Sequence, residues 1–149
     1  MIRMEKKDTA KRRLNAGEKP EDLKIKELVE EMNKAKRQRL PVLDEKGAAV
    51  YIIHLSTLTE FVAQKSLGGT APADIEKLTI GQLKADAKDL FDKILAWKPV
   101  PRGGTLADAK KAMEALRDCS DVFVTESGQA NEPVLGWVTN ADIALYSKA

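Results

Sequence analysis

The sequence predicts a mixed α/β (α+β) protein that is built from two similar halves. Its 149 residues are 43% apolar and 32% charged, a balance typical of a globular domain. Apolar residues at helical spacing alternate along the chain with strand-sized apolar runs. The order helix, strand, turn, strand, helix occurs twice, and two such small layers can bury their sheet faces against each other.

Composition argues against several classes of protein. No apolar run approaches the ~18 residues of a membrane-spanning helix, and no apolar stretch follows the basic N-terminus, so no secretory signal is predicted. The single cysteine, Cys119, cannot form an internal disulfide, and with one histidine it cannot complete a Cys/His metal cage. We therefore expect a cytoplasmic protein without a metal site.

Charge is distributed unevenly along the chain. Residues 1–40 contain 13 basic and 8 acidic side chains, whereas residues 41–149 contain 12 and 15. Residues 1–23 are expected to form a basic N-terminal arm, which could attract nucleic-acid phosphates. The arm has no aromatic residue for base stacking, so a solvated segment is the favoured interpretation and nucleic-acid binding is the weaker alternative.

Residues 24–67 are expected to form the first repeat. Apolar residues recur at spacings of three and four over 25–32, which predicts a helix. The runs 40–43 and 50–53 predict two strands, and the turn between them makes a hairpin. Ser56 can cap the helix that follows.

Residues 68–98 are expected to form a helical linker, and residues 99–149 the second repeat. Thr105 is placed to cap the first helix of this repeat. Short strands are predicted at 122–124 and 134–138, before a final helix.

The two repeats match at nearly constant offsets. Residues up to the first strand match 81 positions apart, as Val42 does with Phe123. Residues after the turn match 85 positions apart, as Val50 does with Leu135, so the second copy has four additional turn residues.

Three segments resemble the domains named after cystathionine β-synthase, the CBS domains. Leu40–Gly47 is similar to their LPVVDEDG string, and Thr105–Met113 to their TLxEAxxxM helix. Leu135–Ile143 is similar to their hGhhTxxDh junction between a strand and a helix, where h is apolar. The resemblance covers about residues 24–65 and 99–147. It implies a tandem CBS pair, or Bateman module, with two repeats packed as a pseudo-two-fold pair.

The resemblance implies a regulatory sensor that binds an adenine nucleotide or an adenosyl compound between the repeats. Thr139 and Asp142 match the family residues that hold ribose and phosphate. The expected ligands are AMP, ADP, ATP or S-adenosylmethionine, with no cofactor required. The regions expected to contact adenine contain Val100, Pro101, Val122 and Phe123.

The junction has a physical rationale for ligand binding. A helix N-terminus presents N–H groups and partial positive charge to a phosphate, and the Asp142 carboxylate can accept hydrogen bonds from ribose hydroxyls. Gln38 and Arg39 precede the first hairpin, where the resemblance implies contact with phosphate, and the forked donors of arginine suit that role. The first copy has His54 and Thr57 at the matching positions and therefore lacks the carboxylate.

Catalysis finds little support, so we expect no enzyme. The chain has no Gly-x-Ser-x-Gly, His-Glu-x-x-His or Gly-x-Gly-x-x-Gly motif. Asp118 and Asp121 follow a helix, where solvation is the simplest interpretation. A homodimer is expected, with Leu58, Phe61 and Met113 as candidate contacts. An enzyme or a transporter that the protein regulates is a further expected partner. A ligand-free dimerisation or interaction module remains the main alternative.

Overall fold

The computed structural model describes residues 11–147, which form two three-stranded sheets. The first sheet contains β1 (Arg12–Arg13), β2 (Arg39–Leu43) and β3 (Ala49–His54). The second contains β4 (Lys98–Pro101), β5 (Asp121–Thr125) and β6 (Gly136–Thr139). In each sheet the first strand is parallel to the second, and the third is antiparallel to the second. The predicted mixed fold with two repeats is confirmed.

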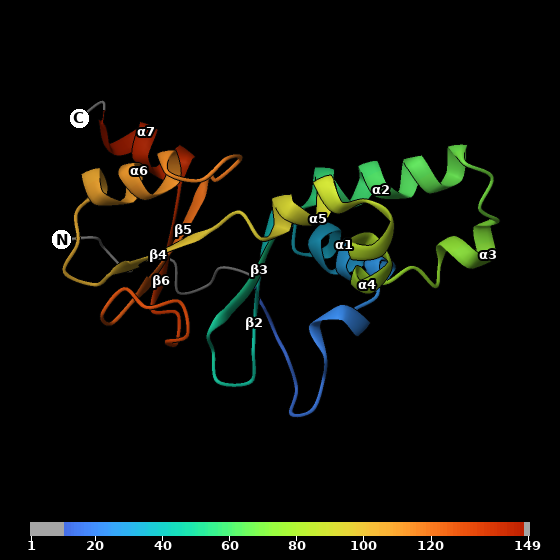
Figure 1. Cartoon of the computed structure of the whole chain (residues 1–149), viewed down its shortest axis with the longest axis horizontal. Coiled ribbons are helices and arrows are strands. Elements are labelled where there is room, and N and C mark those ends of the chain that lie inside the picture. Colours follow the sequence, from blue (N-terminus) through green and yellow to red (C-terminus); the bar gives the residue numbers. More distant parts are fainter. Residues whose placement is uncertain (1–10, 148–149) are drawn as a thin grey trace.

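Helices flank both sheets (Figure 1). A short 3-10 helix η1 (Pro20–Asp22) precedes α1 (Ile25–Lys34), and α2 (Leu55–Leu67) follows β3. Between the repeats lie α3 (Pro72–Ile75), α4 (Ile80–Asp86) and α5 (Lys88–Ile94). The second repeat has α6 (Leu106–Glu114) and α7 (Asn140–Ser147). Thr105 caps α6 as predicted, accepting a hydrogen bond from the N–H of Asp108.

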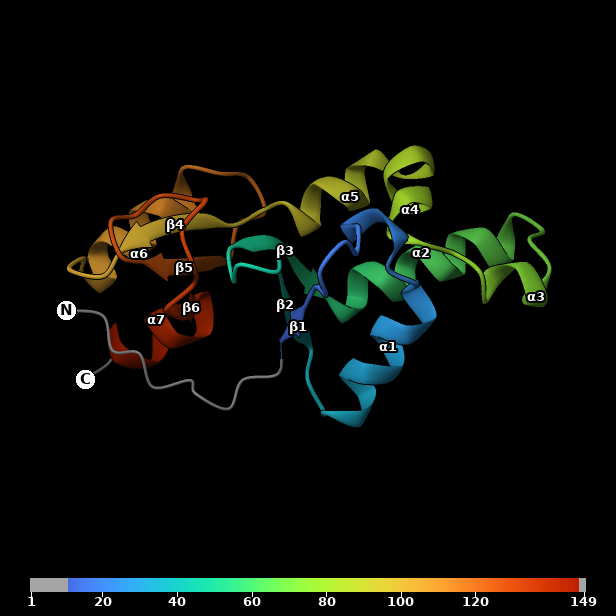
Figure 2. The same ribbon diagram turned by 90° about the horizontal axis from the view of Figure 1, so that it is seen from below.

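The two repeats differ in how their cores are covered. Figures 1 and 2 show α3, α4 and α5 gathered beside the helices of the first repeat, whereas α6 and α7 lie at the other end of the molecule. Side chains from 78–94 join the core of the first repeat, which contains 17 buried residues against 7 in the core of the second, counted over the residues whose side chains the structure describes. The helices between the repeats therefore extend the first core and leave the second without equivalent cover.

The first sheet begins inside the segment that we expected to be a solvated arm. Arg12 is the parallel neighbour of Val42, and the N–H of Leu14 donates to the carbonyl of Leu43 at 2.8 Å. Leu14 is only 6% exposed, which anchors the strand in the core. The strand is held by backbone pairing, which does not require apolar side chains. Its two arginines therefore gave no apolar pattern by which the sequence could predict it. Residues 1–10 of the expected arm lie outside the described residues.

The sheet register corrects the match between the repeats by one residue. Val42 lies opposite Tyr51, and Val124 lies opposite Gly136, so Val124 is the counterpart of Val42. Phe123 is the counterpart of Pro41. The cause is one additional residue between α6 and β5, which a constant offset along the sequence does not take into account.

All three expected dimer contacts are buried, and Met113, at 7% exposure, belongs to the core of the second repeat. Leu58 is 0% exposed and Phe61 is 1% exposed, and both belong to the core of the first repeat. They cannot form a dimer surface in this fold. The apolar stripe of α2 packs in the core of the first repeat. The sequence pattern therefore predicted the helix correctly, but the prediction that its apolar face contacts a second protomer was wrong.

Candidate functional site in the cleft between the two repeats

Alternation along the strands directs a separate set of side chains into the cleft between the sheets. On β2, Leu40 and Val42 pack in the core of the first repeat, so Arg39 and Pro41 project from the opposite side. On β5, Val122 and Val124 pack in the core of the second repeat. Asp121 and Phe123, on the other side of β5, face the first repeat.

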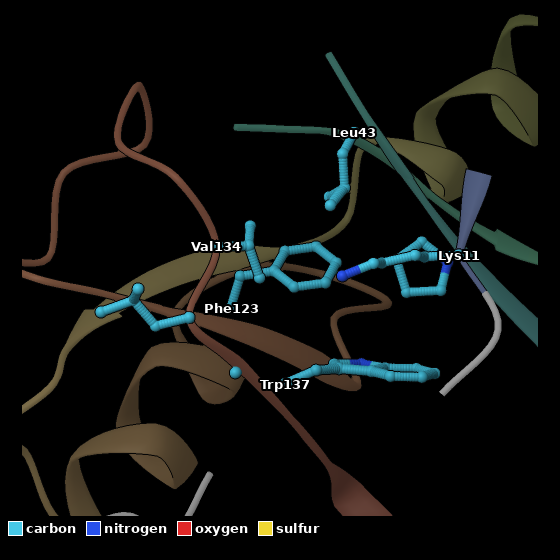
Figure 3. Close-up of a pocket in the computed structure, with 8 residues that line it drawn as sticks. Lys11, Leu43, Phe123, Val134 and Trp137 are labelled. Atoms are coloured by element: carbon cyan, nitrogen blue, oxygen red, sulfur yellow. The ribbon is translucent and has the colours of Figure 1, made fainter. Parts of the chain in front are cut away.

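A small cavity lies in this cleft (Figure 3). Its volume is about 70 Å³, well below the ~300–1,000 Å³ of a typical ligand site. In Figure 3 the amine of Lys11 points toward the ring of Phe123, and Trp137 lies below both in this view. A nucleoside can enter only if the two sheets move apart. The lining residues are Lys11, Pro41, Leu43, Phe123, Val134, Leu135, Gly136 and Trp137.

Aromatic side chains hold the cleft closed. Phe123 is 0% exposed and packs edge-on against Trp97, with ring centroids 5.4 Å apart. Trp137 lies on another side of Phe123 at 6.5 Å. The indole N–H of Trp97 donates to the carbonyl of Val50 in the first repeat at 3.2 Å. Trp97 therefore helps to fix one repeat against the other.

A charged cluster adjoins the aromatic residues. The Asp121 side chain is fully buried, and Nη1 of Arg39 lies 3.0 Å from its Oδ2. Nε2 of His54 lies 3.0 Å from Oδ1. The indole N–H of Trp137 donates to Oδ2 at 2.8 Å, and the Ser120 hydroxyl donates to Oδ1 at 3.1 Å. Because an ionised carboxylate only accepts hydrogen bonds, Nε2 of His54 carries the hydrogen.

This cluster contradicts the expectation that Asp121 is solvated. Burial by itself raises the pKa of the Asp121 carboxyl. The hydrogen bond from His54 and the positive charge of Arg39 outweigh that effect, so the pKa lies below its ordinary value. The carboxylate is ionised at neutral pH and joins the repeats by an ion pair. Its partners are 82 and 67 residues away in sequence, so no local pattern could indicate them.

Arg39 and Asp121 occupy equivalent places in the two repeats. Arg39 lies opposite His54 in the first sheet, and Asp121 lies opposite Thr139 in the second. The pseudo-two-fold relation thus brings two equivalent positions face to face. Two side chains of the same charge would repel each other at these positions. Arg39 and Asp121 have opposite charges and attract each other.

Thr139 and Asp142 begin α7 with reciprocal hydrogen bonds. The N–H and hydroxyl of Thr139 donate to Oδ2 of Asp142 at 2.8 and 3.1 Å. The N–H of Asp142 donates to the Thr139 hydroxyl oxygen at 3.2 Å. The pair forms a capping box of the kind that stabilises helix N-termini. The carboxylate that we expected to hold ribose therefore has a structural role in this conformation.

Arg39 reaches this same junction from the other repeat. Its Nη2 donates to Oδ1 of Asn140, the first residue of α7, at 2.8 Å, and its Nη1 donates to the carbonyl of Ser120 at 3.2 Å. The structure thus brings together Arg39, Thr139 and the start of α7. Gln38 is exposed, and its backbone carbonyl accepts the N–H of Leu55 at 2.8 Å.

The four residues expected near adenine fall into two groups. Phe123 lines the cavity, and Pro101 is exposed on β4. Val100 and Val122 lie on the other side of the sheet, in the core of the second repeat. Trp137, which also lines the cavity, was not among the expected site residues. Its alternation with Val138 along β6 was the available sign that it faces the cleft.

The junction in the first repeat differs from that in the second. His54 precedes α2 without capping it, because its ring is hydrogen-bonded to Asp121, and the expected cap Ser56 lies within the helix. Thr57 is 4% exposed. Both residues line a polar hollow of about 220 Å³ with Lys93. This junction has hydroxyls and an imidazole but no carboxylate at the position of Asp142.

Residues 11–147 contain neither a cluster of metal ligands nor a membrane-spanning helix. No group of three or more His, Cys, Asp or Glu side chains in this range is placed to hold a metal ion. No helix in the same range has the length and apolar character needed to cross a membrane.

Comparisons with known proteins agree with this architecture. The sequence model of the CBS domain matches residues 20–64. No curated protein matches the sequence significantly.

Several solved structures have a similar fold at low sequence identity. Hypoxic Response Protein I with two coordinated zinc ions has a TM-score of 0.57 and 17% identity, over 96% of this chain and 93% of that one. A CBS domain-containing protein of unknown function from Kribbella flavida has 0.57 and 19%, over 94% and 92%. The CBS domain of a bacterial CNNM/CorC family Mg²⁺ transporter in complex with ATP has 0.58 and 14%, over 96% and 80%. Residues 20–64 therefore match the CBS domain, and the two repeats together have the fold of a tandem CBS pair.

Proposed function

We propose that the chain is a regulatory module that binds an adenine nucleotide or an adenosyl compound in the cleft between its repeats. The observation that carries this proposal is the convergence at the start of α7. Thr139 and Asp142 come from the second repeat, and Arg39 reaches Asn140 from the first. A similar CBS structure is a complex with ATP. The junction combines a helix N-terminus, a carboxylate and a guanidinium, which suit a phosphorylated or hydroxylated ligand.

Binding would act by changing how the repeats pack. The cavity of about 70 Å³ has to widen, so a ligand separates Phe123 and Trp137 from Pro41. Asp142 would exchange its bond from Thr139 for bonds from ribose hydroxyls. The ligand thereby favours the open packing, and a partner enzyme or transporter reads the difference. No covalent chemistry is involved.

Calorimetry with matched variants tests this function. ATP, AMP and S-adenosylmethionine are titrated into the protein, the Asp142→Ala variant and the Thr57→Ala variant. We expect Asp142→Ala to weaken binding by about ten- to hundredfold, because hydrogen bonds to a charged group contribute ~1.5–3 kcal/mol. Thr57→Ala, at the matching place in the first repeat, should change affinity little. Equal effects of the two substitutions would contradict the site.

A ligand-free interaction module is the second candidate. The observation in its favour is the closed cleft, which Phe123 and the Arg39–Asp121 pair hold shut. This function predicts no binding heat with any of the three ligands. Under that outcome the repeats would serve only as a rigid scaffold for a partner.

We also propose that the protein is a homodimer that uses α6 and α7. A groove of about 720 Å³ runs along these helices, with Met113, Ile143 and Ala144 on its apolar part. Lys110 lines the same groove, as do the acidic residues Glu114 and Asp118. Because the groove carries both positive and negative side chains, two copies related by a two-fold axis can place the basic residue of one copy against the acidic residues of the other.

A further inference from the structure

We propose that Asp121 sets the ligand preference of the cleft. Its carboxylate already forms an ion pair with the guanidinium of Arg39, which a ligand phosphate would otherwise bind. This inference rests on the proposed function and deepens it. The preferred ligand is then an adenosine-type compound whose phosphate groups add little to its affinity.

The first argument is the state of Arg39. Both Nη1 hydrogens are engaged, one by Oδ2 of Asp121 at 3.0 Å and one by the carbonyl of Ser120 at 3.2 Å. Nη2 donates to Asn140 at 2.8 Å. Asp121 also neutralises the charge of the guanidinium. Arg39 therefore holds the start of α7 in place, but it does not offer an uncompensated positive charge to a ligand.

The second argument is the number of donors that meet on Asp121. Arg39 and His54 come from the first repeat, and Ser120 and Trp137 come from the second. Four donors around one oxyanion are the arrangement that a bound phosphate would require. The protein fills this place with its own carboxylate, whose side chain is fully buried.

The third argument is the cost of replacing that carboxylate. A phosphate that approaches Arg39 lies beside Asp121, and two negative charges repel each other strongly where water is excluded. Taking Arg39 away would leave Asp121 buried without its ion pair, which is unfavourable. Adenosine has the same base and ribose as ATP and meets neither obstacle. Asp121 therefore acts as an internal competitor of the phosphate.

The experiment compares two ligands that differ only in their phosphates. Dissociation constants of ATP and adenosine are measured by calorimetry without Mg²⁺, for the unaltered chain and for Asp121→Asn, which has nearly the same shape. We expect the affinity for ATP relative to adenosine to rise about ten- to hundredfold in Asp121→Asn, the value of a charged hydrogen bond. The contribution of Lys11, which lines the cavity, is the same in both proteins and cancels.

Asp118→Asn is the matched control. Asp118 precedes the same strand and loses the same charge, but its ion-pair partner is the exposed Arg117 at 3.9 Å. We expect the relative affinity for the two ligands to stay unchanged in this variant. If Asp118→Asn raised the affinity for ATP relative to adenosine as much as Asp121→Asn does, the effect would come from net charge alone, and the inference would be overturned.

The unaltered chain keeps the inference testable if Asp121→Asn fails to fold. We expect ATP to bind the unaltered chain less than about tenfold more tightly than adenosine does, because Asp121 already pairs with the guanidinium of Arg39. If Asp121→Asn folds, adding Arg39→Gln in that background should cancel its gain in ATP affinity. ATP that binds the unaltered chain more than about tenfold more tightly than adenosine would overturn the inference.

Two further outcomes are distinguishable. If both ligands bind the unaltered chain and Asp121→Asn leaves their relative affinity unmoved, the inference is wrong and the proposed function stands. If neither ligand binds any of the proteins, the inference is wrong, and the proposed function is wrong as well if AMP and S-adenosylmethionine also give no binding heat.

Discussion

At the scale of single residues, one buried carboxylate joins the two repeats. Asp121 accepts hydrogen bonds from side chains of both halves, among them the guanidinium of Arg39 and the imidazole of His54 from the first repeat. Such a pair is costly to bury but fixes geometry, because each partner would be left unsatisfied if the other moved. Its strength should therefore depend on the ionisation of Asp121.

The acid dependence of stability tests this ion pair. The pKa of Asp121 lies below its ordinary value in the folded protein, so the unfolded chain binds a proton more readily. The stabilisation is fully present above the unfolded pKa of about 3.9 and is lost as the pH falls through the folded pKa. Urea unfolding from about pH 7 to about pH 2.5 should show a smaller loss of unfolding free energy in Asp121→Asn. Parallel curves for the two proteins would contradict the ion pair.

Phe123 is the apolar counterpart of this contact. It is 0% exposed and packs against Trp97 and Trp137. We expect Phe123→Ala to lower the unfolding free energy by about 3–5 kcal/mol, measured by urea denaturation. Leu67→Ala is the control, because Leu67 is 90% exposed and its loss should cost less than ~0.5 kcal/mol. A loss well under ~1 kcal/mol for Phe123→Ala would contradict its burial.

Single residues also show where sequence reasoning stops. The motif identified Thr139 and Asp142 because both lie within four positions of one junction, and local spacing determines their contact. The role of Asp121 is invisible in the same sequence, since its partners come from strands of the other repeat. Arg39 was singled out for a phosphate, and its ion pair with Asp121 could emerge only once the register of both sheets was known.

At the scale of elements, helices and hairpins follow local patterns closely. The predicted strands at 40–43 and 50–53 correspond to β2 and β3, because alternation and a tight turn define a hairpin within a few residues. β1 was missed, because its two arginines have no apolar pattern and its partner β2 lies far along the chain. Pairing over such a separation depends on the tertiary fold.

A residue with a left-handed backbone follows α1 two positions after its end, and another follows α6 four positions after its end. Lys36 has φ of 54° and Asp118 has φ of 60°. After α1, the N–H of Arg37 donates to the carbonyl of Met32 at 2.9 Å, as in a Schellman motif. Glycine is the residue that adopts this conformation without steric cost.

Replacing Lys36 should therefore stabilise the protein. The left-handed conformation costs an ordinary residue about 1–2 kcal/mol, and glycine removes this cost. Glycine also raises the conformational entropy of the unfolded chain, which cancels about 0.4–1 kcal/mol of the gain. We expect Lys36→Gly to raise the unfolding free energy by about 0.5–1 kcal/mol. Lys36→Ala, which keeps the Cβ atom, should give no such gain. Destabilisation by Lys36→Gly in urea denaturation would contradict the backbone conformation.

At the scale of the whole molecule, the two repeats are unequal. The helices between them complete the core of the first repeat, whereas α6 and α7 leave a groove beside the smaller core of the second. Duplication was visible in the sequence, but this inequality was not. Whether an apolar stripe meets its own core or a partner depends on which helices cover it, and that depends on the complete fold.

The open groove should make the protein a dimer. Sedimentation at tens of micromolar protein should give twice the mass of the chain, and Ala144→Glu should convert the protein to a monomer, because Ala144 is exposed and lines the groove. Leu67→Glu adds the same charge on α2, away from the groove, and should leave the dimer intact. A monomer before any substitution would contradict this surface.

A crystal structure of the chain grown with saturating adenosine tests the central claim most directly. The account predicts a widened cleft, the adenine ring between Phe123 or Trp137 and Pro41, and the ribose hydroxyls on the carboxylate of Asp142. The junction of His54 and Thr57 should contain no nucleoside. Adenosine bound at that first junction, or outside the cleft, would contradict the account.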